Sequence, residues 1–347
     1  MYIYILNLAF ISIIGAVIFN NGINKSKNKV FLIMSSIAMI LISSLRDTKV
    51  GFDTENYISY FNEISKIPLT NIFKFPLEKG YVFLNKIISY ISIDSRVFFF
   101  IISAFIIYSF SRFIYKNSKN VFLSVILFLC LGFFGDSLNI TRQMIAISII
   151  LYAYEYIKID KYFNAILITL LAISFHKTAI VFFIYIIVSK YKITNKYIIT
   201  YFIMSVIILF IGKPLINIIN NIFYSDKYSS FVVGEGINLF LLYLSINIFG
   251  VLLINKVLKK DRLMFFEYHG IFLQTIFQAL CIYFSLFSRT VRYFSIFNII
   301  FIPNIISSIE NKSLRILIYY LVILASLLLY YLSIETHGIM PYVFFKT

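Results

Sequence analysis

The sequence YFNAILITLLAISFHKTAIVFFIYIIVS, residues 162–189, is an apolar run interrupted near its middle by His176 and Lys177. As a single helix, this run would bury both polar residues deep in a membrane, where ionisable groups are costly. Two short helices that meet at His176 would instead place both residues at a membrane surface. We therefore expect a helical hairpin with His176 at its tip. This choice fixes the side of the membrane on which every later loop lies.

The chain as a whole is apolar enough to be a membrane protein. Of its 347 residues, 61% are hydrophobic and only 13% are charged, whereas soluble domains average about 25% charged residues. Apolar stretches long enough to cross a bilayer recur along the chain. The sequence predicts an all-α polytopic membrane protein, folded as a single multi-pass domain over residues 1–347, with about twelve spans. The expected spans are 2–19, 30–45, 97–114, 121–135, 142–157, 162–175, 177–189, 197–212, 237–255, 267–287, 293–308 and 315–333.

The net charge of +16 indicates topology rather than nucleic-acid binding. Most of the excess comes from lysine-rich loops between spans, and such loops usually lie in the cytoplasm. This rule places both chain termini outside, provided that residues 81–93 do not cross the membrane. Polar residues of that segment, including Asn85 and Lys86, share one helical face, as expected of a helix that lies in the membrane interface.

This topology leaves two notable segments on the outer side, 46–96 and the smaller 213–236. After Asp53 and Thr54, aromatic and apolar residues recur from Tyr57 onward at the spacing i, i+3, i+4, i+7. This spacing predicts a short amphipathic helix. Asp and Thr are also favoured residues at the start of a helix, so a capping role for Asp53 is the structural alternative to a role in chemistry.

Arginine, rather than lysine, collects at the outer ends of the expected spans. The residues concerned are Arg46, Arg142, Arg289 and Arg292, and His176 is expected at the same level. A guanidinium group binds phosphate oxygens through paired hydrogen bonds and stays charged in any environment. The set therefore predicts a diphosphate site just above the lipid surface.

Two of these arginines also have ordinary ion-pair interpretations. Arg46 could pair with Asp47 or Asp53, and Arg142 could pair with Asp136. Under these interpretations the arginines would stabilise the outer ends of helices and would bind no substrate.

Other candidate residues are equally open to a structural interpretation. His176 could be a solvated interfacial histidine, and Glu78 could merely flank the interfacial helix. One of the two arginines at 289 and 292 could extend toward lipid headgroups. No metal-ligand spacing and no glycine-rich phosphate loop is present in the sequence, so we expect neither a metal nor a cofactor.

Six motifs resemble, in order and spacing, those of EpsG/Wzy-type polysaccharide polymerases, from about residue 43 to the C-terminus. They are LRDTKVGFDTENY (45–57), PLEKGYVFLNKII (76–88), LNITRQMIAISII (138–150), AISFHKTAI (172–180), SRTVRYFSIFNIIFIPNII (288–306) and MPYVFF (340–345). The resemblance implies a GT-C-like membrane glycosyltransferase of surface polysaccharide biosynthesis. Such enzymes polymerise oligosaccharide repeat units carried on undecaprenyl diphosphate at the outer face of the bacterial plasma membrane.

The resemblance also implies roles for individual residues. The four arginines are expected to bind the diphosphate and glycan, together with Gln143, which follows Arg142 in its motif. His176 is the first candidate for a general base, because its ordinary pKa suits the pH outside the cell. Asp53 and Glu78 are alternatives as base or sugar anchor. Tyr57 could stack on a sugar ring.

The implied partners are the undecaprenyl-diphosphate-linked oligosaccharide, the lipid bilayer, and proteins that regulate chain length or flip the lipid-linked unit. A lipid-linked oligosaccharide flippase and an O-antigen-ligase-type transferase remain alternative functions, because both must also bind a lipid diphosphate. A membrane acyltransferase with His176 as its base is a further alternative, although four outer arginines suit it less well.

Overall fold

The computed structural model describes residues 1–223, 236–335 and 338–345, which fold into helices joined by short connections. In chain order the helices of the first half are α1 (Tyr2–Phe19), α2 (Lys25–Ser44), α3 (Thr54–Lys66), η1 (Leu69–Lys74), α4 (Lys79–Ile91), α5 (Ser95–Asn117), α6 (Val121–Cys130), α7 (Phe133–Asn139), α8 (Thr141–Ile157) and α9 (Tyr162–Ile173). Those of the second half are η2 (Lys177–Val181), α10 (Phe182–Val188), α11 (Asn195–Phe223), α12 (Ile237–Lys260), α13 (Met264–Cys281), η4 (Ser285–Phe287), α14 (Ser288–Ser295), α15 (Asn298–Ser308) and α16 (Lys312–Ser333).

Among the described residues, six helices are long and apolar enough to cross a membrane, or up to eight if each of two bent pairs forms one span. The six are α1, α2, α5, α11 as far as Pro214, α12 and α16, and the bent pairs are α6 with α7 and α14 with α15. The all-α, multi-pass class is confirmed, whereas the count of twelve and the GT-C-like fold are not. The count differs partly because α9 and α10 have only 12 and 7 residues, too few to span a bilayer alone.

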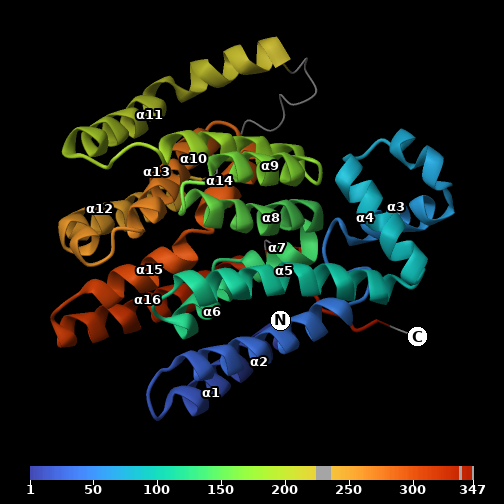
Figure 1. Cartoon of the computed structure of the whole chain (residues 1–347), viewed down its shortest axis with the longest axis horizontal. Helices are drawn as coiled ribbons and strands as arrows, with labels where there is room; N and C mark the ends of the chain where they lie inside the picture. Colours follow the sequence, from blue (N-terminus) through green and yellow to red (C-terminus); the bar gives the residue numbers. More distant parts are fainter. Residues whose placement is uncertain (224–235, 336–337, 346–347) are drawn as a thin grey trace.

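Asparagine caps begin three helices that have lysine in or just before their first turn. The side chain of Asn24 accepts a hydrogen bond from the Lys27 N–H, and Asn120 and Asn311 cap α6 and α16 in the same way. Such caps satisfy backbone donors at a helix start and stabilise a helix by about 1 kcal/mol. Figure 1 shows the turns between α1 and α2 and between α15 and α16 at the opposite end of the bundle from α3 and α4. This arrangement agrees with the predicted separation of lysine-rich loops from the outer segment.

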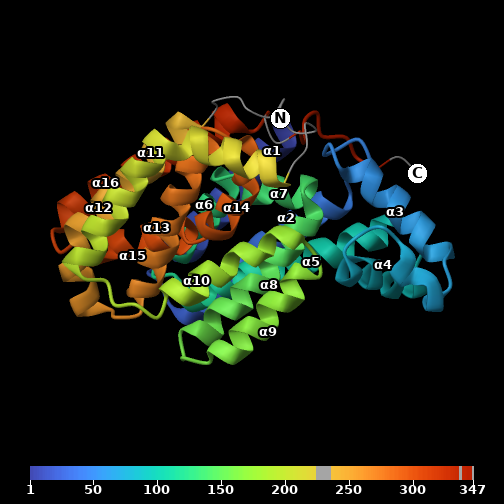
Figure 2. The same ribbon diagram turned by 90° about the horizontal axis from the view of Figure 1, so that it is seen from above.

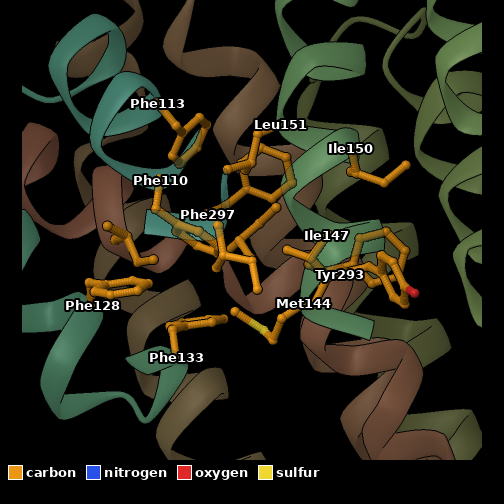
Figure 3. Close-up of a cluster of buried hydrophobic side chains, with 14 of the residues drawn as sticks. Phe110, Phe113, Phe128, Phe133, Met144, Ile147, Ile150, Leu151, Tyr293 and Phe297 are labelled. Carbon is orange, nitrogen blue, oxygen red and sulfur yellow. The ribbon is translucent and has the colours of Figure 1, made fainter. Parts of the chain in front are cut away.

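Helix α8 lies between α5 and α9 in both views (Figures 1 and 2) and is buried along most of its length. In the core, Met144 and Ile147 of α8 face Phe110 of α5, Phe133 of α7 and Phe297, which precedes α15 (Figure 3). Burial of such large side chains contributes roughly 1.5–3 kcal/mol each. Because its core side is packed so tightly, α8 fixes the position of the polar residues in its first turn.

The structure contains the predicted break at His176. Helix α9 ends at Ile173, η2 begins at Lys177, and α9 packs beside α10 (Figures 1 and 2). The break lies in the same region of the molecule as the start of α4, because the Gly80 N–H donates to the Ser174 carbonyl at 2.8 Å. The hairpin therefore places His176 close to the segment 46–96, which was predicted to lie outside.

The amphipathic helix predicted after Asp53 is present as α3, with Tyr57, Phe61 and Ile64 buried. Together with η1 and α4 it forms a compact unit beside one end of the bundle (Figure 1). Within this unit, Ile64, Ile72 and Val82 form a small core of their own.

Helix α4, predicted to lie in the membrane interface, turns its polar residues inward. Asn85 and Lys86 are buried, and the Lys86 Nζ donates to the Ser65 carbonyl at 2.8 Å. The exposed face is apolar instead and includes Phe83 and Ile87, which are 45% and 42% exposed. Packing against the neighbouring segment thus takes up the polar face and leaves an apolar stripe on the outside of the protein.

The smaller outer loop predicted at 213–236 is only partly visible. Helix α11 continues through Pro214 to Phe223, so the first part of that segment is helical rather than a loop. Residues 224–235 lie outside the described residues.

Residues 338–345 return to the beginning of the outer segment. The Asp47 N–H donates to the Val343 carbonyl at 2.8 Å, and the Phe345 N–H donates to the Leu45 carbonyl at 2.9 Å. These bonds make a short antiparallel contact between the two ends of the fold. We call residues 338–345 the C-terminal ribbon. The ribbon anchors the loop that leads into α3.

Candidate functional site

The Glu78 carboxylate links Arg142 to His176. Arg142 Nη1 donates to Glu78 Oε2 at 2.7 Å, and His176 Nδ1 lies 3.8 Å from Glu78 Oε1. The three side chains are 11–25% exposed, so each is largely shielded and still reachable. They come from the start of α4, the first turn of α8 and the tip of the α9–η2 hairpin, and only the tertiary fold brings them together.

Close contact between α4 and the end of α9 holds Glu78 next to His176. Besides its hydrogen bond to Ser174, Gly80 approaches this residue so closely that a Cβ would clash with the Ser174 Oγ and lie 2.9 Å from the Ser174 carbonyl oxygen. Glycine is therefore the residue that fits this position. The sequence motif contains this glycine, but nothing in the pattern showed what it approaches.

Burial, together with the charges of Arg142 and Arg289 and against the opposing effect of Glu78, lowers the pKa of His176 to about 4. The imidazole is therefore neutral at neutral pH. Among the described residues, neither ring nitrogen has a hydrogen-bond partner. A neutral imidazole can accept a proton from a hydroxyl group, and a neighbouring carboxylate stabilises the imidazolium that results.

Tyr57 connects Asp53 to this cluster. Its hydroxyl donates to Asp53 Oδ2 at 3.5 Å, and its ring meets that of Tyr81 at 6.1 Å between centroids. Burial raises the pKa of Tyr57 to about 12; Asp53 reinforces the shift and Arg142 opposes it. The Tyr57 side chain is buried, so it lies behind Arg142 rather than on an open surface.

Asp53 precedes α3 as expected, but its side chain makes no capping hydrogen bond. Its backbone N–H instead donates to Asn139 Oδ1 at 3.1 Å. The capping interpretation of the Asp53 carboxylate is therefore wrong. This leaves the carboxylate partly exposed at the edge of the cluster.

Arg289 is exposed near His176, on whose pKa its charge acts. The backbone carbonyl of Arg289 accepts a hydrogen bond from Gln143 Nε2 at 2.6 Å. Gln143 is buried, so this bond ties α14 to α8. Within the part of the chain that the structure describes, the Arg289 guanidinium has no carboxylate partner. Its charge is thus available to an anionic ligand.

Arg292 faces α7 instead of the Glu78 cluster. Its Nε lies 2.9 Å from Asp136 Oδ2, and its Nη1 donates to the Leu131 carbonyl at 3.1 Å. The guanidinium also lies over the ring of Phe133. The expected pairing of Arg142 with Asp136 is therefore wrong, because Asp136 pairs with Arg292.

Two bent helix pairs border a cavity of about 220 Å³ beside Arg292, which has a mainly apolar lining and several polar side chains. The α6–α7 pair bends by 49° near Gly132, and the α14–α15 pair bends by 41°. Interrupted helices are tolerated within a membrane where they are buried or line a cavity. The polar side chains that line this cavity include Arg292, Tyr243, Gln278, Ser295 and Asn298.

Arg46 is fully buried away from the Glu78 carboxylate. Its guanidinium lies 4.0 Å from the centroid of the Phe99 ring and donates to the carbonyls of Ser43 and Leu138. Burial lowers the pKa of Arg46 to about 10, so it still carries its charge at neutral pH. The expected pairing with Asp47 or Asp53 is wrong, because backbone carbonyls and an aromatic ring surround the guanidinium.

The cluster shows no sign of a metal centre. Across residues 1–223, 236–335 and 338–345, no group of three or more His, Cys, Asp or Glu side chains could hold a metal ion. The arrangement of Glu78, Arg142 and His176 is instead suited to anion binding and proton transfer.

Comparison with known proteins yields a family and no individual relative. A family model described as the EpsG family matches residues 29–344, a range that contains every site residue discussed above. No curated protein and no solved structure matches the chain.

Proposed function

The chain belongs to the EpsG family, a family of Wzy-type polysaccharide polymerases, and we propose that it joins undecaprenyl-diphosphate-linked oligosaccharide repeat units at the outer face of the bacterial plasma membrane. The observation that supports this reaction best is the Glu78 carboxylate between Arg142 at 2.7 Å and His176 at 3.8 Å. The exposed cation of Arg289 lies in the same region.

The proposed reaction is a glycosyl transfer between two lipid-linked substrates. The growing glycan is bound through the anomeric carbon of its reducing-end sugar to a lipid diphosphate. A hydroxyl oxygen on the non-reducing sugar of an incoming unit bonds to that carbon. The bond between the carbon and the diphosphate oxygen breaks, and its electron pair leaves with the diphosphate. The hydroxyl proton passes to a base.

Arg142 and Arg289 are the proposed ligands of the departing diphosphate. Negative charge on that group grows in the transition state, and guanidinium groups already in place lower the barrier most effectively. Arg142 is held by Glu78 and backed by Tyr57, whereas Arg289 is exposed. The Arg142 guanidinium is therefore pre-positioned, whereas the Arg289 side chain is free to move onto the ligand.

His176 is the proposed general base. Its neutral imidazole can accept the hydroxyl proton, and the Glu78 carboxylate then lies beside the new positive charge, as in catalytic triads. A positioned base typically contributes about 10²–10⁴ in rate. The partly exposed Asp53 carboxylate is the proposed anchor for a sugar hydroxyl.

Two related functions use similar groups. An O-antigen-ligase-type transferase would run the same chemistry on a different acceptor, and a flippase would need access to its cationic site from both faces of the membrane. The three residues of the cluster gather at the end of the bundle where α4 lies, which favours a transferase. The proposed protein partners are a flippase that delivers the units and a regulator of chain length.

The test is a strain that lacks this chain, complemented with the wild type or with Arg142→Ala at equal membrane abundance. A polymerase predicts loss of long glycan, retention of single repeat units on the outer-leaflet lipid, and no rescue by the variant. Long glycan that persists on undecaprenyl diphosphate would instead indicate a ligase. Accumulation on the cytoplasmic leaflet would indicate a flippase. Arg262→Ala, an exposed arginine in another loop, serves as the matched control.

A further inference from the structure

An apolar groove runs along α8 between α5 and α9. It encloses about 530 Å³ and is lined by Leu84, Ile101, Ile102, Phe105, Ile145, Ile149, Tyr152, Tyr156, Ile168, Leu171 and Phe175. Its floor includes the buried residues Ile102 and Ile145, while Phe105 and Leu171 are 36% and 52% exposed at its rims. The groove is therefore open along its side, and its lining consists of apolar and aromatic side chains.

One end of the groove, which we call the upper end, lies near α4 and adjoins the cluster of Glu78, Arg142 and His176. Phe175 immediately precedes His176, and Ile145 lies on α8 one helical turn after Arg142. Leu84 of α4 completes this end. A molecule whose anionic head contacts Arg142 would therefore have its apolar tail directly above the groove.

Toward the other end of the groove, a cation lies over the ring of one lining residue, Tyr152. The Arg112 guanidinium lies 4.6 Å from the centroid of the Tyr152 ring, whose hydroxyl is 3.4 Å from the Ser109 Oγ. From Ile145 to Tyr156 the helix rises by roughly 16 Å, at about 1.5 Å per residue. This length is about half of the ~30 Å hydrocarbon thickness of a bilayer, so the groove accommodates several isoprene units.

We propose that this groove binds the first part of the polyisoprenoid chain of the substrate whose diphosphate contacts Arg142. This inference rests on the proposed function and adds to it the place of the lipid. A branched, wholly apolar chain matches a groove lined by isoleucine, leucine and aromatic side chains. Continuity with the Arg142 cluster distinguishes this groove from the other large apolar hollow.

That second hollow, between α1, α6 and α16, has a similar volume of about 520 Å³. Its lining includes Phe19, Asn20 and Ile23, which lie at the turn between α1 and α2, just before the lysines of the first turns of α2. None of the cluster residues lines it. It therefore provides a comparison site of similar volume that has none of the proposed diphosphate-binding residues beside it.

The experiment uses the full chain in phospholipid nanodiscs and a polyisoprenyl diphosphate with a benzophenone at the far end of a short chain. Light should attach the probe to residues of α8, α9 or α5 near the lower half of the groove. Excess unlabelled polyisoprenyl diphosphate should displace it, whereas phosphatidylglycerol at the same concentration should not. Attachment mainly around α1 and α16, or displacement by phosphatidylglycerol alone, would overturn the proposal.

Leu171→Trp fills the groove and has a close control. Leu170, the neighbouring residue on α9, is 50% exposed, compared with 52% for Leu171, but does not line the groove. Leu171→Trp should reduce probe attachment and raise KM for the lipid-linked substrate by at least about tenfold, the loss expected when a few methylene groups leave their site. Leu170→Trp should change neither quantity.

The outcomes separate the groove from the function. If Leu171→Trp and Leu170→Trp behave alike while Arg142→Ala abolishes long glycan, the groove assignment is wrong and the polymerase proposal stands. If Arg142→Ala makes normal polymer, the proposed site fails, whatever the probe does.

Discussion

Arg142 and Glu78, 64 residues apart in the chain, form an ion pair of 2.7 Å in which the carboxylate also faces His176. Such a partly buried pair restrains both groups and is costly to break from one side, because the remaining charge loses its partner. The pair therefore fixes the relative positions of the Arg142 guanidinium and the Glu78 carboxylate, and it places that carboxylate beside the neutral imidazole of His176. Each of the following predictions tests one consequence of that arrangement or of the packing that supports it.

Glu78→Gln should lower the rate of glycan polymerisation by about 10²–10³, the effect typical of losing one pre-positioned electrostatic group. The variant keeps the shape of the side chain but removes the charge that orients Arg142 and stabilises a protonated His176. Polymerisation is measured with purified protein and lipid-linked repeat units. Glu63→Gln, an exposed carboxylate on α3 bonded to Ser59, is the control. Equal rates for both variants would show that the Glu78 charge is dispensable.

The pH profile of the reaction should report the lowered pKa of His176. Because this pKa falls from 6.5 to about 4 in the folded protein, the base stays neutral well below pH 6.5. The acid limb of kcat/KM should therefore lie near pH 4 to 5 rather than near 6.5. His176→Ala should lower the rate by about 10²–10⁴ and remove that limb. An acid limb that persists unchanged in His176→Ala would assign the base to another group.

The same shift predicts how His176 affects stability. Between pH 6.5 and 4 the unfolded chain binds a proton at this residue and the folded chain does not. The contribution of His176 to the free energy of unfolding is therefore constant above pH 6.5 and decreases as the pH falls through this window. Thermal unfolding of wild type and His176→Ala across this range should show the wild type losing more stability in acid.

Gly80→Ala should destabilise the folded protein by about 1–3 kcal/mol, the usual cost of forcing an extra methyl group into a packed site. The added Cβ meets the side chain and the carbonyl of Ser174. Unfolding can be followed with a thiol-reactive dye, since Cys130 and Cys281 are free and buried. Ser174→Ala in the same background removes only the side-chain clash, so it should restore part of the lost stability. An unchanged unfolding midpoint would show that the start of α4 and the end of α9 can move apart at little cost.

Arg46→Met should reduce stability while leaving the activity of each folded molecule within about twofold. The substitution removes the stacking on Phe99 and hydrogen bonds to two carbonyls, an expected loss of about 2–4 kcal/mol. The measurements are the unfolding midpoint and the rate per folded molecule. A hundredfold loss of rate in well-folded protein would instead indicate that Arg46 takes part in substrate binding.

The sequence predicted those features that depend on local pattern. The spacing of Tyr57, Phe61 and Ile64 was enough to predict α3, and the polar break at His176 was enough to predict the hairpin. The expected topology assigned Arg142, His176 and Glu78 to one end of the bundle, but it assigned Arg46 and Arg292 to the same end, so it could not single out the three side chains that meet.

Partners within that group could not be predicted, because ion pairs depend on how helices turn in space. Asp136 is close to Arg142 in sequence, which suggested a local pair, yet the bend after Gly132 directs it to Arg292. The burial of Arg46 depends on the C-terminal ribbon, which no local pattern near Arg46 reveals. The count of twelve spans is not confirmed for a related reason, since short helices that pack in pairs have the same hydropathy as single spans.

The C-terminal ribbon has a consequence for biosynthesis. The Tyr342 hydroxyl donates to the Ile42 carbonyl across 300 residues, so the ribosome must translate past residue 342 before the connection between α2 and α3 can reach its native state. Nascent chains that stop before the ribbon would insert their helices, but the connection that leads into α3 would lack its hydrogen bonds to the ribbon.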